Sequence, residues 1–159
     1  MTDTLNFYET DSKNLSLRYE NADVSEIQEL LLTTFEEKAK QNIENKVKEI
    51  TSLKATGTKT KSGLIYQIIK KGSGKKPTNG TQVLIHYAGY LENGQLFDTS
   101  YEDVAKLYGK FDQNRADQNG YAGYPVTMGS LPFIPGFNEG VEMMSYGDKI
   151  MLYIPSELG

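Results

Sequence analysis

Phe97 and Asp98 place a large apolar ring beside a carboxylate at the point where a predicted strand ends. The preceding run, Val83 to Leu91, is mostly apolar and is followed by Asn93-Gly94 and a second short apolar run. An Asn-Gly pair between two such runs predicts two antiparallel strands joined by a tight turn. A ring offers an apolar surface and a carboxylate an acceptor, so the end of this hairpin is the first candidate site.

His86 is the single histidine of the chain, and it is the next residue that could do chemistry. On the alternation rule for strands, His86 and its neighbour Tyr87 point to opposite faces. The chain has no cysteine and no second histidine. It therefore lacks the side chains that most often bind a catalytic metal, and His86 is a poor candidate for activating a nucleophile. We predict that local hydrogen bonds satisfy His86.

Two loops invite a ligand interpretation that their spacing excludes. The glycines and lysines of residues 72–78 suggest a phosphate loop, but Ile69 stands where that motif needs its first glycine. The polar stretch from Asp112 suggests a calcium loop, but it has no glycine at the sixth position and Gly123 at the twelfth, where an acid is required. The sequence therefore predicts no metal and no cofactor.

Several blocks of the sequence resemble the FKBP-type peptidyl-prolyl cis-trans isomerases. The segments His86-Tyr87-x-Gly89 and Phe97-Asp98-Thr99-Ser100 are similar to the core motif of that family. Three further blocks follow the family pattern in the same order: Ser62 to Tyr66 with Gly72-x-Gly74, Phe133 to Val141, and Gly147 to Lys149 with Tyr153 to Pro155. The resemblance covers roughly residues 60 to 159.

The resemblance implies an α+β fold, in which an FKBP-like antiparallel β-sheet wraps on a short α-helix near residues 136–144. It also implies a bowl of apolar side chains that holds the proline of a substrate. The expected catalytic residues are Tyr87, Phe97, Asp98 and Ile134, and the expected substrate-binding residues are Tyr124, Phe133 and Phe137. By the same resemblance, the backbone N–H of Ile134 holds the substrate carbonyl and Asp98 lies at the rim as an acceptor.

The chain departs from the family pattern in four places. Phe137 stands where many members have Trp, and Pro132 replaces a residue that is often acidic. Residues 107–123 form an insertion of about 15 to 20 residues compared with the shorter members. Members continue after Ile154 to Gly159 with a last strand that is central in the sheet, so we expect the domain at 63–159 to lack it. Either the natural chain continues, or a strand from another chain fills the gap.

The residues before the resemblance predict a helical extension. Residues 1–20 hold two alternating patches that fit strands, residues 21–55 repeat apolar side chains at helical spacing from Ile27 to Ile50, and residues 56–62 are a linker. Ser25 and Gln28 fit a capping box at the helix start. The apolar stripe either packs on its own domain or on a neighbouring one, or it forms a homodimer, as in bacterial members with an amino-terminal helical stalk.

Composition limits the class of protein. With 38% apolar and 24% charged residues, a net charge of -4 and no long apolar run, the sequence predicts a soluble product that binds neither nucleic acid nor a membrane.

We expect prolyl isomerisation of X-Pro bonds in polypeptides, assisting protein folding. The alternative is a non-catalytic binding or chaperone module that holds a partner chain. The resemblance adds a macrolide inhibitor as a ligand. The expected location is cytoplasmic, or periplasmic if a signal segment was removed.

Overall fold

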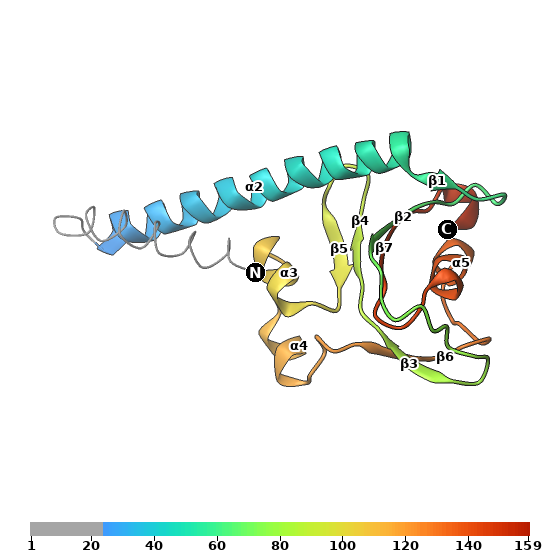
Figure 1. Ribbon diagram of the computed structural model, residues 1–159. Coiled ribbons are helices and arrows are strands. Elements are labelled where there is room, and N and C mark those ends of the chain that lie inside the picture. Colours follow the sequence, from blue (N-terminus) through green and yellow to red (C-terminus); the bar gives the residue numbers. More distant parts are fainter. Residues whose placement is uncertain (1–23) are drawn as a thin grey trace. The chain divides into compact units, whose positions relative to one another are not determined.

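The computed structural model describes residues 24–159, which Figure 1 shows as a ribbon. The strands predicted within residues 1–20 lie outside the described residues. The chain divides into two units, residues 1–40 and residues 41–159, and each is considered by itself.

The long helix that the apolar periodicity predicted is present as α2 (Val24–Thr56). Within residues 24–40, Leu31, Leu32 and Phe35 are exposed. Within residues 41–56 the same stripe faces the domain instead. Leu53 is only 2% exposed, and the carbonyl of Ile43 and the side chain of Val47 lie against Gly94. The carboxyl-terminal half of the stripe therefore packs on its own domain, the first of the two arrangements expected for it.

Within residues 41–159 the strands form three small antiparallel sheets. The first sheet has β2 (Ile65–Lys70) between β1 (Thr58–Lys59) and β7 (Lys149–Tyr153); the second pairs β3 (Gln82–Ile85) with β6 (Tyr124–Thr127); the third pairs β4 (Ala88–Tyr90) with β5 (Leu96–Thr99). The expected α+β class is confirmed. Residues 56–62 differ from the predicted linker, because they contain β1, whose Thr58 pairs with Tyr66.

The predicted hairpin exists, but it is shorter than the sequence suggested. The N–H of Leu91 donates to the carbonyl of Gln95, 2.9 Å away, and β4 and β5 pair on either side of this turn. The first half of the predicted strand separates from the hairpin as β3 and pairs with β6. The break falls at His86 and Tyr87, where the N–H of Tyr87 donates to the side-chain hydroxyl of Ser100 and not to a backbone carbonyl.

The short helix that the resemblance implied is α5 (Pro135–Met143), which begins with proline in its first turn. It lies beside β7 (Figure 1). Two glycines four apart allow this close packing, since a Cβ at Gly136 would lie 2.5 Å from Ile154 and one at Gly140 would lie 2.2 Å from Leu152.

The insertion at residues 107–123 begins where the short helix α3 (Glu102–Leu107) ends, and it contains a second short helix, α4 (Gln113–Asp117). A 3₁₀ turn, η1 (Ser156–Leu158), follows β7. The side-chain amide of Asn42 in α2 donates to the carbonyl of Leu107, and the hydroxyl of Tyr108 donates to the carbonyl of Asn42, both at 3.2 Å. The insertion is thus tied to the carboxyl-terminal half of α2.

The core of the domain is formed by apolar side chains from both helices and strands. Its buried hydrophobic side chains are Leu53, Leu64, Leu96, Ala105, Val126, Met128 and Val141. None of the helices in residues 24–159 is both long and apolar enough to span a bilayer.

Gly94 offers a test of the contact between the hairpin and α2. Its φ is +81°, and a Cβ there would lie 2.3 Å from the carbonyl oxygen of Ile43. We expect Gly94→Ala to lower the free energy of unfolding by at least about 3 kcal/mol, since backbone strain and overpacking add. Urea unfolding measures this.

Gly74→Ala is the matched control for that substitution. Gly74 has a φ of +75° but nothing within 4 Å of the added Cβ, so only the backbone cost of about 1 kcal/mol is expected. Equal losses for the two variants would show that α2 does not press on the turn.

Candidate active site

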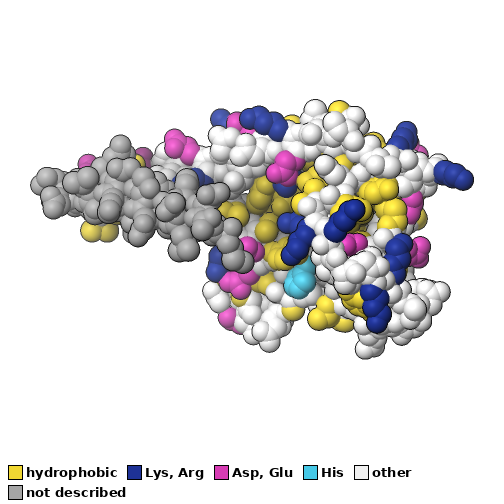
Figure 2. Space-filling view, in the orientation of Figure 1, with side chains coloured by type: hydrophobic (Ala, Val, Ile, Leu, Met, Phe, Trp, Pro, Cys, Tyr) yellow, Lys and Arg dark blue, Asp and Glu magenta, His cyan; other side chains and the backbone are white. Residues whose placement is uncertain are grey.

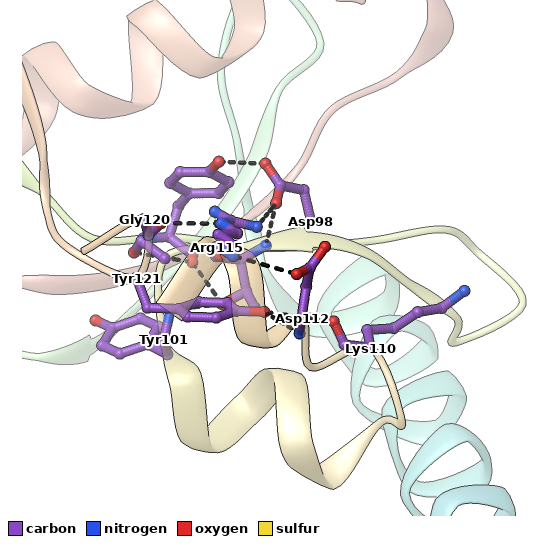
Figure 3. Close-up of polar contacts among 10 residues, drawn as sticks. Asp98, Tyr101, Lys110, Asp112, Arg115, Gly120 and Tyr121 are labelled. Atoms are coloured by element: carbon purple, nitrogen blue, oxygen red, sulfur yellow. Dashed lines mark hydrogen bonds and ion pairs between the residues drawn. The ribbon is translucent and has the colours of Figure 1, made fainter. Parts of the chain in front are cut away.

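The carboxylate of Asp98, in β5, joins three parts of the domain. It accepts hydrogen bonds from the hydroxyl of Tyr87, from Nη1 of Arg115 at 2.8 Å and from the N–H of Thr99 at 2.8 Å. Figure 3 shows the Asp98 carboxylate and the Arg115 guanidinium facing each other. The predicted site residues Tyr87 and Asp98 are therefore in direct contact.

Arg115 comes from α4, inside the insertion, and uses its whole guanidinium fork. Besides the bond to Asp98, Nη2 donates to the carbonyl of Thr99 and Nε to the carbonyl of Gly120, each at 2.9 Å. The guanidinium also lies over the ring of Tyr121, with its carbon 4.6 Å from the ring centroid (Figure 3). A guanidinium holds its five donors in one rigid plane, so it can bind several acceptors in a fixed geometry that the compact ammonium of a lysine does not provide.

Our sequence analysis missed Arg115. The insertion has no counterpart in the motif blocks, so nothing aligned it with Asp98. The available signal was composition: the chain has only two arginines, Arg18 and Arg115, and one of them lies in the segment that follows the Asp98 motif.

The hydrogen bonds at Asp98 set its pKa. Partial burial by itself would raise the pKa of the carboxyl group, but hydrogen bonds from Tyr87, Arg115 and the Thr99 N–H outweigh it, and the pKa lies below its ordinary value of 3.8. Burial first, and then the hydrogen bond to Asp98, raise the pKa of the Tyr87 hydroxyl above 10.0. Near neutral pH the pair is therefore a carboxylate and a protonated phenol.

Two buried hydroxyl residues fix the backbone of Tyr87. The N–H of Tyr87 donates to Oγ of Ser100 at 2.9 Å, and its carbonyl accepts from Oγ1 of Thr99 at 2.9 Å and from the N–H of Ser100 at 2.9 Å. Thr99 and Ser100 are 2% and 3% exposed, and buried hydroxyls need such partners. This explains why the Phe97-Asp98 pair is followed by Thr-Ser.

Four of the predicted aromatic residues form one continuous series of edge-to-face contacts. The ring centroids lie 5.4 Å apart for Tyr124 and Phe133, 4.9 Å for Phe133 and Phe137, and 6.4 Å for Phe137 and Tyr87. The side-chain amide of Asn138 in α5 holds this series in place by donating to the carbonyl of Phe133 at 3.0 Å. We call these four rings the aromatic series.

Ile134 and Phe97 lie outside the aromatic series. Ile134 precedes α5 at its N-cap position, where its carbonyl accepts from Phe137 and Asn138. Among residues 24–159 its own N–H has no acceptor. The N–H of Ile134 can therefore donate to a substrate. The side chain of Phe97 is 65% exposed, and its ring covers Gly89, where an added Cβ would lie 2.4 Å from Cζ.

His86 has a local hydrogen-bonding partner, as predicted, although it lies between β3 and β4 and not within a strand. Its Nδ1 lies 3.2 Å from Oγ of Ser100, and its ring stacks on Tyr101 with centroids 5.0 Å apart. It takes no part in the aromatic series.

Comparison with known proteins agrees with the motif blocks. Residues 73–159 match the FKBP-type peptidyl-prolyl cis-trans isomerase family. The chain is 34% identical over 97 residues to an FK506-binding protein of Neisseria meningitidis serogroup B, a match that covers 61% of this chain and 73% of the relative. The chain therefore belongs to the FKBP-type peptidyl-prolyl cis-trans isomerase family.

Longer relatives match more of the chain. An FKBP-type peptidyl-prolyl cis-trans isomerase FkpA from Aeromonas hydrophila is 34% identical over 75% of this chain and 39% of its own length, and a probable FkpA of Neisseria meningitidis is 31% identical over 93% and 50%. The chain thus spans about half or less of these relatives. The crystal structure of FkpA from Escherichia coli aligns with a TM-score of 0.48 at 24% identity, covering 100% of this chain and 70% of that one.

The pKa of Asp98 tests the role of Arg115. Arg115→Ala should raise that pKa toward or above 3.8, since it removes both a hydrogen bond and a positive charge. A ¹³C NMR titration of the carboxyl carbons measures the change. Lys106→Ala, which removes an exposed pair with Glu102, should leave Asp98 unchanged. An Asp98 pKa that is the same in Arg115→Ala and in the parent protein would contradict the geometry.

The same lowered pKa makes a prediction about stability. A carboxyl group whose pKa is lower in the folded than in the unfolded state stabilises the fold above the unfolded value, and this contribution is lost as pH falls through the folded value. The difference in unfolding free energy between the parent and Asp98→Asn should therefore be constant near neutral pH and shrink below about pH 3.8. A difference that is constant down to pH 2 would show that the Asp98 pKa is not lowered by folding.

Proposed function

We propose that this domain is a peptidyl-prolyl cis-trans isomerase that acts on X-Pro bonds of polypeptides. The observation that carries the proposal is the aromatic series, which ends at the hydrogen bond between Tyr87 and Asp98. Family membership supports the same activity. Assistance to protein folding follows from it, because X-Pro isomerisation is slow enough to limit folding.

The chemistry of this reaction suits a set of rings better than a catalytic triad. Rotation about the peptide bond has a barrier of about 18–20 kcal/mol, because the amide loses its resonance as it twists. No covalent bond is made or broken, so a catalyst has only to bind the twisted amide better than the planar one. The planar amide is the more polar state, so apolar, water-poor surroundings disfavour the ground state more. A millionfold acceleration needs about 8 kcal/mol of this difference.

Each predicted residue has a role in this mechanism. We assign Tyr87, Tyr124, Phe133 and Phe137 to contact with the proline ring and Phe97 to an exposed wall beside them. The free N–H of Ile134 would hold the substrate carbonyl. Asp98 orients the hydroxyl of Tyr87 by accepting its hydrogen bond, and Arg115 balances the charge of the carboxylate. None of these groups has to transfer a proton, so activity should vary little between pH 6 and pH 8.

A second function, holding of an unfolded or partner chain without turnover, is favoured by one observation. Several large apolar side chains of the domain are exposed, among them Leu84, Phe97, Tyr124 and Ile134. Exposed apolar surface of this kind is typical of protein-binding sites. Binding of an X-Pro peptide with no acceleration of its isomerisation would select this function over catalysis.

Phe97→Ala tests the isomerase proposal in a protease-free peptide assay. We expect kcat/KM to fall by at least about tenfold, since the variant removes a wall that contacts the twisted amide. Its side chain is 65% exposed, so the fold should be retained. Leu84→Ala, which removes a 70% exposed side chain from β3, is the matched control and should change kcat/KM less than about twofold. Equal effects of the two variants would place the reaction elsewhere.

We also propose that the exposed half of the apolar stripe on α2 pairs with a second copy of the chain. Leu31, Leu32 and Phe35 are large apolar side chains exposed on this helix, and such a stripe is stabilised by a partner.

Binding of a macrolide inhibitor to the aromatic series is a further proposal, supported by the family. A cytoplasmic location, with the periplasm as the alternative, likewise stays a prediction.

Phe35→Glu tests the pairing of α2. The variant places a charge on the apolar stripe and should convert a dimer into a monomer in analytical ultracentrifugation. Thr33→Glu, an equal charge change on an exposed neighbour of the same helix, should stay dimeric. A parent protein that sediments as a monomer at tens of micromolar would remove the proposal.

A further inference from the structure

Five lysines gather where the end of β2 meets the start of β7. They are Lys70, Lys71, Lys75, Lys76 and Lys149, and all five are exposed. The sequence does not reveal this cluster, because Lys149 is more than seventy residues from the others. The structure brings them together by pairing Lys70 with Lys149 across the two strands and by joining the loop of residues 71–76 to that of residues 145–148.

The junction between these two loops is held by backbone hydrogen bonds. The N–H of Ser73 donates to the carbonyl of Tyr146 at 2.8 Å, and the N–H of Tyr146 donates to the carbonyl of Lys75 at 3.0 Å. The carboxylate of Asp148 accepts from the N–H of Gly72 at 2.6 Å and from that of Ser145 at 2.7 Å. The lysines therefore project from a fixed backbone.

None of the five lysines forms an ion pair within the part of the chain that the structure describes. The backbone N–H groups of Ser145 and Gly72 lower the pKa of Asp148, and the charges of Lys71 and Lys76 lower it further. Lys70 and Lys149 are directly opposite each other, and like charges in that arrangement destabilise a sheet. Asp148 attracts two of the lysines, and Lys70, Lys75 and Lys149 have no ion pair of their own among the described residues. The cluster therefore keeps positive charge that an anionic ligand can bind.

We propose that these five lysines form a docking surface for an acidic segment of a polypeptide. Ammonium groups attract carboxylates from several directions and need no fixed fork. Ile69 and Tyr146 are exposed beside the lysines and can contact the apolar side chains of such a segment. The net charge of the whole chain is -4, so acidic ligands are repelled by the rest of the surface and drawn to this one.

An acidic polypeptide fits the surface better than a membrane. Interfacial binding requires an apolar face that enters the lipid, whereas the large apolar side chains that accompany the lysines, Ile68, Ile69 and Tyr146, are each only about half exposed. The proposal goes beyond the isomerase site, and it holds whether or not the domain catalyses isomerisation.

The test measures binding of fluorescein-labelled polyglutamate of about 20 residues, which contains no proline, by fluorescence anisotropy at low salt. The whole chain is compared with a triple variant, Lys71→Glu with Lys75→Glu and Lys76→Glu. We expect the parent to bind polyglutamate, the triple variant to bind it at least about tenfold more weakly, and 0.5 M salt to weaken the parent similarly, since exposed charges are screened.

A second triple variant provides the matched control. Lys59→Glu with Lys61→Glu and Lys110→Glu changes the net charge equally at exposed lysines outside the cluster and should retain binding within about twofold of the parent. Thermal unfolding verifies that both variants fold. The proposal is overturned if the parent does not bind polyglutamate, if both variants lose binding equally, or if the parent binds only vesicles of phosphatidylcholine and phosphatidylserine in a ratio of about 7 to 3.

Discussion

The site depends on the carboxylate of Asp98, because this one group connects three segments that are distant in sequence. Tyr87 precedes β4, Asp98 lies in β5 and Arg115 lies in the insertion, and the two side-chain hydrogen bonds to Asp98 hold them together. The guanidinium balances the charge on the carboxylate, and the hydrogen bonds to Asp98 hold its pKa below the ordinary value in spite of partial burial. The phenol of Tyr87 is thereby fixed at the end of the aromatic series.

The rest of the domain supports the elements that carry these groups. The carboxyl-terminal half of α2 presses on the turn of the β4–β5 hairpin through Ile43 and Val47, and Lys54 of α2 pairs with Glu92 beside the same turn at 2.7 Å. The glycines of α5 let that helix approach β7, which sets the position of Phe137. Figure 2 shows hydrophobic side chains exposed on the face of the domain that includes β4 and β5. The apolar surface to which we assign proline binding is thus carried by packed elements.

The sequence predicted the parts of this account that depend on local patterns. The Asn93-Gly94 turn and the long helix follow from turn chemistry and periodicity, and the resemblance carried by the motif blocks led to the α5 helix, to Tyr87 and Asp98 and to the other rings. It did not predict the separation of β3 from the hairpin, because hydroxyl bonds from Thr99 and Ser100 to Tyr87 depend on tertiary contact. Arg115 and the cluster around Lys149 were missed for a related reason. The contact of Arg115 with Asp98 and the lysine cluster both bring together residues that become neighbours only when the chain folds.

We have proposed that the aromatic series receives the proline ring of a polypeptide. Intermolecular NOEs between a short peptide with an isotopically labelled proline and the chain of residues 1–159 test it most directly. If the proline ring binds to the aromatic series, NOEs should connect it to the rings of Tyr87, Phe133 and Phe137. NOEs confined to rings elsewhere, such as that of Tyr146, with none to these three, would contradict it.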